Sequence, residues 1–271
     1  MVTYYLKLKR INMKPRKSPK LVTVVSTEAL SKNIQRIVFS ADELHSFDEN
    51  CAGQYIKLLF NQKGGTELPK VSLWSKPSMR TYTIRSFDRA NLLMSVDFVV
   101  HRDGSVRGLA CDWALRAKAG DTITIAGPGN GQVLPTGAQN YLLFGDMTSL
   151  PAIAVMLERL SANAVGQAFI QVESESDIQK LAKPLAVEIH WLIANPSSSV
   201  LLEAVESIPT SDQIPAIWCA CDFNQMRAIR SIVTKWSNFN RELTYFSSYW
   251  KPGVTEDGHK ALKQQDQQQR A

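Results

Sequence analysis

The stretch Arg80-Thr81-Tyr82-Thr83-Ile84-Arg85 carries the strongest structural signal in this chain of 271 residues. Side chains alternate between the two faces of a β-strand, so Arg80 and Tyr82 are expected on one face and Thr83 at the strand's end. A guanidinium matches the geometry of phosphate oxygens, and an aromatic face can cover a planar ring system. On these six residues alone, an ordinary barrel strand with exposed arginines is an equally good interpretation.

Five further β-rich runs surround this stretch between Leu21 and about Ala126: LVTVVS, NIQRIVFS, QYIKLLF, LLMSVDFVVH and TITIAG. Six strands at this spacing predict a closed antiparallel β-barrel. Residues 61–79, NQKGGTELPKVSLWSKPSM, are too rich in Gly, Pro and Lys for regular structure. We expect a long surface loop there, of the kind that often carries function.

After Pro135 the pattern changes to strands that alternate with helices. The runs YLLFGD, QAFIQVES, VEIHWLIA and AIWCACD are separated by helical segments, and a last strand, ELTYFSSYW, follows them. This alternation predicts a parallel sheet covered by helices on both faces. The Gln-rich tail is expected to lack fixed structure beyond about Gln264. The predicted divisions are a basic arm (1–20), a barrel domain (21–135), an α/β domain (136–250) and a C-terminal tail (251–271).

Composition and charge exclude several classes of protein. Hydrophobic residues make up 44% of the chain, as in a folded protein. The net charge of +6 comes from the arm, where seven Lys or Arg and no acid lie within residues 1–20. Without interleaved aromatic residues such an arm is weak evidence for nucleic acid, and we expect none as a partner. No run of about 18 apolar residues and no signal-peptide pattern is present, so we expect a cytoplasmic protein without stable membrane association.

The four cysteines form neither a disulfide framework nor paired CxxC motifs. Cys219 and Cys221 lie two residues apart in a predicted strand, so both should point to one side of it. Core packing is favoured over redox chemistry for this pair.

Several separated motifs extend the signal of residues 80–85 in a fixed order. VDFVVH (96–101) is followed by Gly104, GLACDWA (108–114), KAGD (118–121) and GPG (127–129), and then by GDMTSLPAI (145–153) and YWKPG-TED (249–257). Together they resemble the siderophore-interacting protein family of ferric-siderophore reductases, whose members typically carry VDFVLH, GPASRWA, PGD, GGPRG, GDETALPAI and YWRRGRTEDE. The resemblance extends from about Leu21 to His259.

The resemblance implies a ferredoxin–NADP reductase-like fold, with a six-stranded barrel that binds FAD and an α/β domain that binds NADH or NADPH. It implies that Arg80 pairs with the FAD pyrophosphate, while Tyr82 and Thr83, as the catalytic residues, stack on the isoalloxazine and hydrogen-bond near its N5. The amides around Gly108 to Cys111 would face the pyrophosphate, because helix N-termini bind anions. The predicted cofactor-binding residues are Arg80, Tyr82, Thr83, Ile84, Asp97, Val99, His101, Gly108, Leu109, Ala110, Cys111, Trp113, Gly145, Asp146, Thr148 and Trp250.

The implied reaction passes electrons from a nicotinamide through FAD to Fe(III) in a siderophore. Hard oxygen ligands hold Fe(II) far less strongly than Fe(III), so reduction releases the iron, which is substrate rather than a metal bound by the protein. Ferric siderophores are commonly anionic, and a basic docking groove is therefore expected. Its predicted residues are Lys57, Lys251, His259 and Lys260. The arginine of GGPRG is absent, since Asn130 follows Gly129.

The nucleotide is expected at the carboxyl end of a parallel strand, beside Gly145 and Asp146. A Cys221-Asp222 pair replaces the family's Gly-Glu pair. The acidic run ESESD (173–177), with no Arg or Lys between 167 and 178, favours NADH over NADPH, because a carboxylate binds a ribose 2′-hydroxyl and repels a 2′-phosphate. The same acids could instead simply begin the next helix.

Two alternatives are open at this stage. A flavoprotein of the same fold could exchange electrons with a protein partner such as a ferredoxin, to which the basic arm is suited. A carrier of ferric siderophores could keep the fold without redox turnover. Nothing in the sequence demands more than a monomer, and nothing in it distinguishes hydroxamate from catecholate siderophores.

Overall fold

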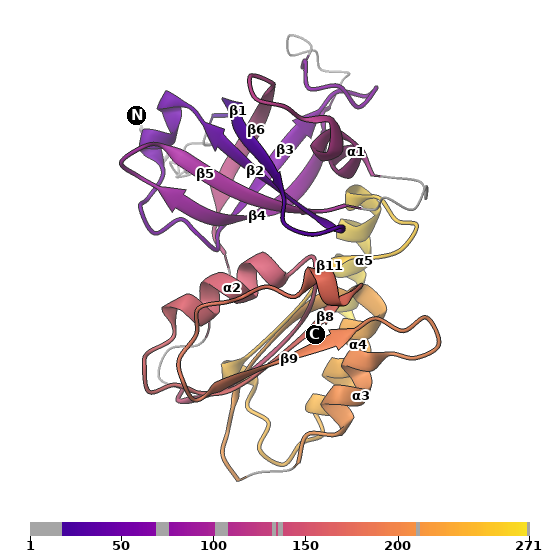
Figure 1. Ribbon diagram of the computed structural model, residues 1–271. Helices are drawn as coiled ribbons and strands as arrows, with labels where there is room; N and C mark the ends of the chain where they lie inside the picture. Colours follow the sequence, from indigo (N-terminus) through magenta and orange to yellow (C-terminus); the bar gives the residue numbers. More distant parts are fainter. Residues whose placement is uncertain are drawn as a thin grey trace, which may run out of the picture.

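The computed structural model describes residues 18–68, 76–100, 108–131, 134, 138–209 and 212–269. They form two domains, a β-barrel and, beneath it in Figure 1, an α/β domain. Of the predicted features, His101, the arm as far as residue 17 and the middle of the loop at 61–79 lie outside the described residues.

Six strands close the N-terminal barrel, as predicted, and all of their pairings are antiparallel. Around the barrel they follow the order β1 (Lys20–Ala29), β2 (Ile34–Ser40), β5 (Leu93–Val99), β4 (Ser78–Asp88), β3 (Tyr55–Phe60) and β6 (Thr122–Gly129). A 3-10 turn, η1 (Asp42–Ser46), follows β2. Closure removes the sheet edges that an open sheet would expose.

Strand alternation fills the barrel with apolar side chains. In β3 the side chains of Ile56, Leu58 and Phe60 are fully buried, whereas Lys57 between them is not. A short helix, α1 (Leu109–Arg116), adds Trp113 to this core, where the indole stacks on Phe39 at a centroid distance of 6.1 Å. Helix α1 therefore belongs to the barrel and covers part of its interior.

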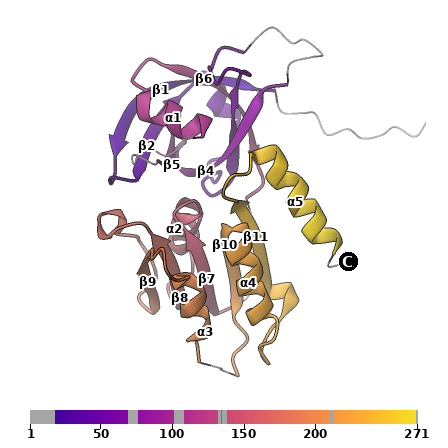
Figure 2. The ribbon, with the colours of Figure 1, turned by 90° about the vertical axis from the view of Figure 1, so that its right-hand side faces the viewer.

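The second domain is a five-stranded sheet whose pairings are all parallel, also as predicted. Its order is β11 (Thr244–Trp250), β10 (Ala216–Asp222), β7 (Asn140–Asp146), β8 (Val165–Val172) and β9 (Val187–Ile193). Helix α2 (Leu150–Arg159) packs on one face, and α3 (Val200–Glu206) and α4 (Phe223–Val233) pack on the other (Figure 2). Cys219 and Cys221 are both buried on the α3–α4 face, as core packing requires. The 3-10 turn η2 (Glu175–Asp177) follows β8, and a second one, η3 (Arg241–Leu243), precedes β11.

Polar contacts join the two domains. The Arg85 guanidinium of β4 lies 2.7 Å from the Glu158 carboxylate of α2. In η2, the buried carboxylate of Asp177 accepts hydrogen bonds from Ser31 and, at 2.8 Å, from the Asn33 amide in the turn between β1 and β2. The barrel is thus held against the face of the α/β domain that carries α2, which lies directly beneath it in both views (Figures 1 and 2).

The C-terminal segment is a helix, α5 (Glu256–Gln268), so the prediction of no fixed structure beyond Gln264 is wrong. Its buried Asp266 accepts hydrogen bonds of 2.8 and 2.9 Å from Arg230 of α4. Lys263 donates to the Ser247 hydroxyl, at 2.9 Å, and to the Ser248 carbonyl of β11, at 3.1 Å. Polar contacts with other elements stabilise this helix, and the composition of the segment gives no sign of them.

Candidate functional site

The carboxyl ends of β7, β10 and β11 meet at the buried carboxylate of Asp146. One of its oxygens accepts from the Trp250 indole N–H, at 2.7 Å, and from the Asp222 amide, at 3.0 Å. The other accepts from the amide of Thr148, at 2.9 Å, and from its hydroxyl, at 2.5 Å. Burial raises the pKa of Asp146, and these hydrogen bonds oppose the shift. The predicted residues Asp146, Thr148 and Trp250 are therefore close together, and Trp250 stays 40% exposed.

Gly145 lies next to this cluster, where the start of α2 packs closely on the end of β7. A Cβ at this position would lie 2.1 Å from the Ser149 hydroxyl oxygen and 2.6 Å from Cδ1 of Ile153. Any other residue would push the start of α2 away from the sheet, which explains the glycine of the GDMTSLPAI motif.

The strand of residues 80–85 lies in β4, at the side of the barrel that faces the α/β domain. Tyr82 packs its ring against Phe98 at a centroid distance of 4.4 Å, and burial raises the pKa of its phenol well above the usual range. Thr83 is buried beside it and Ile84 lies in the barrel core. The Arg80 guanidinium donates to the Met79 carbonyl at 2.7 Å. Their predicted contacts with a flavin stay predictions.

The start of α1 has the features of an anion-binding site. Gly108 is the N-cap residue and provides no side-chain cap, and a Cβ built on it meets nothing within 4 Å. The first amides of a helix have no intrahelical acceptor and carry partial positive charge, so they can bind phosphate oxygens. Ala110, Cys111 and Trp113 bury their side chains in the barrel. Any contact of theirs with a phosphate would therefore come from the backbone, as it would for Leu109.

Two more predicted cofactor residues have protein partners. Asp97 forms a two-pronged ion pair with Arg36 of β2, at 2.7 and 2.8 Å, and this contact raises the pKa of the guanidinium. Val99 packs against the cluster of apolar residues around α2, at the boundary of the two domains. Asp97 thus joins neighbouring barrel strands, while Val99 faces the second domain.

The four predicted docking residues are in different environments. Lys57 forms an ion pair of 2.7 Å with Glu256, the first residue of α5. The Lys251 ammonium lies 5.1 Å from the centroid of the Phe223 ring, and Lys260 is exposed on α5. His259 is buried, with Nε2 2.8 Å from the Ser248 hydroxyl, so its side chain packs between α5 and β11 rather than on a docking surface.

Asp222 and Gln225 were not among the predicted site residues, although both lie at the carboxyl edge of the sheet. One Asp222 oxygen caps α4 by accepting from the amides of Asn224, at 2.8 Å, and Gln225, at 3.1 Å. The other oxygen, and the side-chain oxygen of Gln225, are buried without a hydrogen-bond partner. Unpaired buried acceptors are costly, so this edge is suited to a ligand that donates hydrogen bonds. An aspartate between a strand and a helix is the sequence signal that could have found it.

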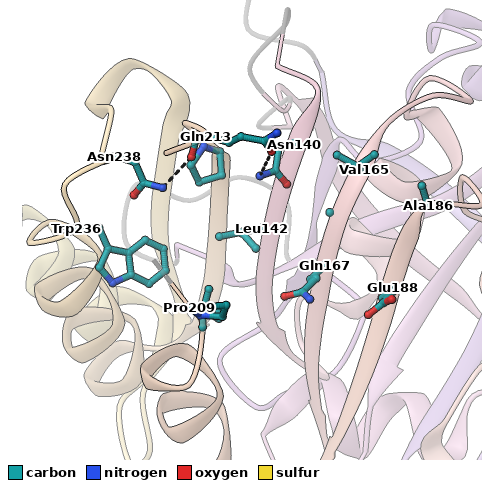
Figure 3. Close-up of a pocket in the computed structure, with 13 residues that line it drawn as sticks. Asn140, Leu142, Val165, Gln167, Ala186, Glu188, Pro209, Gln213, Trp236 and Asn238 are labelled. Carbon is teal, nitrogen blue, oxygen red and sulfur yellow. Dashed lines mark hydrogen bonds between the residues drawn. The ribbon is translucent and has the colours of Figure 1, made fainter. Parts of the chain in front are cut away.

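A cavity of about 350 Å³ opens at the opposite edge of the sheet, near the amino ends of β7, β8 and β9. Figure 3 shows Leu142, Gln167 and Glu188 on these neighbouring strands, with Trp236 across from them. None of the predicted site residues lines it. Ligands of parallel α/β sheets bind at the carboxyl ends of the strands, so we assign the functional site to the edge at Asp146.

The described part of the chain contains neither a cluster of metal-ligating side chains nor a membrane-spanning helix. There, no group of three or more His, Cys, Asp or Glu side chains is placed to hold a metal ion. No helix of the same residues is both long and apolar enough to span a bilayer.

Comparison with known proteins gives a consistent result for both domains. Residues 138–253 match the model of siderophore-interacting proteins, and residues 23–132 match that of the siderophore-interacting FAD-binding domain. Ferric vibriobactin reductase ViuB of Vibrio cholerae is 31% identical over 254 residues, which cover 89% of this chain and 92% of ViuB. The chain belongs to the siderophore-interacting protein family.

Other members of the family and of its fold agree with this placement. The NADPH-dependent ferric-chelate reductase of Escherichia coli is 30% identical over 208 residues, covering 73% of this chain and 79% of that protein. The siderophore-interacting protein SipS of Aeromonas hydrophila superposes with a TM-score of 0.82 at 30% identity, over 93% of this chain and 99% of SipS. The fold is that of ferredoxin–NADP⁺ reductases, since the Plasmodium falciparum enzyme superposes with a TM-score of 0.64 at 12% identity, over 86% of this chain and 97% of that one.

Proposed function

We propose that this siderophore-interacting protein acts in the cytoplasm as a monomeric reductase of ferric siderophores. In this proposal NADH or NADPH supplies electrons through FAD, Fe(III) becomes Fe(II), and the weakened chelate releases iron. The observation that carries it is the meeting of three elements at one place. Glu256 of α5 bonds to Thr81 in β4, and His259 one turn later bonds to Ser248 at the end of β11. Strand β4, which is predicted to bind the flavin, therefore lies beside the carboxyl edge of the sheet.

The residues present fit FAD. Its pyrophosphate would be held by the uncapped start of α1 at Gly108, with Arg80 as the counter-charge, and its ring system by Tyr82 and Thr83. When bound, FAD supplies the ability to take up two electrons as a hydride and return them singly, which no side chain has. The protein's own contribution is to bind, orient and shield, and the buried Thr83 beside the half-buried Tyr82 supports a site with little water.

The carboxyl edge fits a nicotinamide nucleotide. The unpaired oxygens of Asp222 and Gln225 are acceptors for N–H or O–H groups, and a carboxamide and ribose hydroxyls supply both. Asp222→Asn keeps an oxygen to cap α4 but changes the second acceptor to a donor. We expect it to raise the KM for the nucleotide about tenfold while flavin content stays unchanged. An unchanged KM would place the nicotinamide elsewhere.

We propose NADH as the preferred donor, with support from Glu173 and Glu175, which are both exposed after β8. Asp177, the third acid of that run, is turned to the barrel and bound by Ser31 and Asn33. The relative from E. coli carries NADPH in its name, so a direct comparison is the relevant test. Faster and tighter reduction by NADPH in anaerobic stopped flow would contradict the preference.

Anaerobic spectroscopy of the purified protein tests the proposed function. We expect a yellow protein that NADH or NADPH bleaches, and that a ferric siderophore then reoxidises while an Fe(II) indicator develops colour. Tyr82→Ala should lose FAD or shift its spectrum, and Tyr82→Phe should retain both because it keeps the ring. A colourless protein that binds ferric siderophores would favour the carrier alternative. A flavin that only a reduced ferredoxin can bleach would favour a protein donor.

A further inference from the structure

Glu256 places a carboxylate against the lysine that is predicted to dock the substrate. Its Oε1 lies 2.7 Å from the Lys57 ammonium and accepts the Thr81 hydroxyl hydrogen at 2.8 Å. Its Oε2 accepts the Thr81 amide hydrogen at 2.9 Å. Thr81 and Lys57 are cross-strand partners of β4 and β3, so the two groups form one anion-binding corner on the outside of the barrel. A carboxylate from the other end of the chain fills that corner.

The charges around this corner favour an anion. Glu256 and Lys57 are mostly shielded, with side chains 24% and 32% exposed, so their attraction is stronger than that of a fully solvated pair. Burial is the main cause that lowers the pKa of Lys263. The Lys57 charge lowers this pKa further and the Glu256 charge raises it, so Lys263 lies close to the pair. Lys251 lies on the neighbouring Phe223 ring. One carboxylate is thus placed beside two lysines, Lys57 and Lys263.

The Glu256 side chain can leave without unfolding α5. His259, Lys263 and Asp266 hold the body of the helix on β11 and α4, and none of these contacts involves Glu256. The helix begins after Gly253, at φ +71, and is capped by the Thr255 hydroxyl. A change of rotamer at the first helical residue is therefore sufficient to expose Lys57 and the Thr81 amide.

We propose that Glu256 determines substrate specificity, because its carboxylate occupies the position that an anionic oxygen of the ferric chelate takes on docking. This inference rests on the proposed function. When a chelate docks, the Glu256 carboxylate leaves Lys57 and Thr81, and an anionic oxygen of the chelate takes its place. Chelates with high negative charge are attracted most strongly by Lys57, Lys251 and Lys263, so they compete best with the Glu256 carboxylate. Neutral chelates gain little attraction from these lysines.

The test uses the FAD-loaded full chain and gallium analogues of two chelates, since Ga(III) is not reduced under these conditions and binding is measured without turnover. One probe is a trianionic tris-catecholate and the other a neutral tris-hydroxamate, each titrated by calorimetry. Glu256→Gln keeps acceptor and shape but removes the competing charge. We expect it to bind the trianionic chelate about three- to tenfold more tightly and the neutral chelate unchanged.

Two further variants separate the pairwise effect from overall charge. Glu242→Gln removes one charge at an exposed position in η3 and should match wild type for both chelates. In a Lys57→Ala background, Glu256→Gln should give a clearly smaller gain, because the Lys57 ammonium is no longer there to be released. Thermal melting and flavin content verify that each variant is folded and loaded.

Distinct results overturn the inference and the proposed function. If wild type binds the trianionic chelate and Glu256→Gln binds it equally well, or gains as much without Lys57, then Glu256 does not occupy the docking position and the proposed function stands. If flavin-loaded wild type binds neither chelate and reduces neither ferric form, the proposed function fails and the inference with it.

Discussion

Helices α2 and α5 both border the candidate functional site, but they are held by opposite kinds of contact. Residues Leu150 to Leu157 of α2 are all buried between the sheet and the barrel. Helix α5 is held by polar groups, with Glu256 on β3 and β4, Lys263 on β11 and Asp266 on α4. Figure 2 shows α2 enclosed beneath the barrel and α5 on the outside of the molecule. The stability of α2 should follow packing volume, and that of α5 should follow charge and pH.

This difference suits two functions in one site. Helix α2 keeps Gly145, Asp146 and Thr148 in position at the end of β7, and the nucleotide proposed to bind there would need such a fixed geometry. Helix α5 supplies the Glu256 carboxylate of an ion pair with Lys57, which is the group that we propose a charged ligand replaces. The comparison is open to direct tests by substitution in each helix.

The largest expected effect is that of Ile153→Ala in α2. Ile153 is fully buried and packs where Gly145 allows α2 to approach β7. Truncation should lower the free energy of unfolding by about 2–5 kcal/mol, through lost burial and a cavity. Urea denaturation followed by circular dichroism measures it. Lys260→Ala, on the exposed face of α5, is the control and should stay within about 0.5 kcal/mol of wild type. Equal effects would contradict the contrast between the helices.

A smaller effect is expected from Asp266→Ala in α5. The substitution leaves the Arg230 guanidinium, whose side chain is 14% exposed, without its two-pronged partner. We expect a loss on the order of 1–3 kcal/mol, below that of a fully buried pair because Arg230 keeps some contact with water. Hydrogen exchange should become faster in α5 and stay unchanged in α2. The neighbouring exposed Gln265→Ala should alter neither, and unchanged exchange in α5 of the Asp266 variant would contradict its role.

The smallest effect concerns pH and His259. Burial lowers the pKa of His259 below its ordinary 6.5; Lys263 and Lys251 lower it further, and Glu256 and Asp222 oppose them. The unfolded chain therefore binds this proton more readily than the folded chain. Its contribution to stability is complete above about pH 6.5 and falls as the pH drops below that value. Once the slower intrinsic exchange at lower pH is corrected for, the protection of the α5 amides should fall between pH 7 and about 5.5, while that of the α2 amides stays unchanged.

His259→Gln keeps a hydrogen-bonding group for Ser248 without a titrating ring, and it should remove most of this pH dependence. The titration of His259 itself can be followed by nuclear magnetic resonance. A midpoint at or above 6.5 would mean that burial does not govern its protonation, and it would remove the pH argument.

Local patterns were sufficient for most of the architecture. The six barrel strands and the alternating strands and helices follow from side-chain periodicity, because a pattern of period two or 3.6 registers which face is buried. The motif order was also sufficient to identify the family. It singled out Asp146, Thr148 and Trp250 as site residues, and the structure brings these three together. Each of these depends on residues that are near one another in the chain or that repeat a known motif.

Partners from distant parts of the chain were beyond the reach of such patterns. Helix α5 has few apolar residues, so nothing in its own sequence distinguishes a docked helix from a solvated tail. Its docking depends on hydrogen bonds to Arg230, Ser247 and Ser248 of other elements. The same holds for Lys57, whose partner Glu256 is 199 residues away. Burial and pairing of charged groups depend on which surfaces the fold brings together, and for this protein that is the information a linear pattern of residues does not contain.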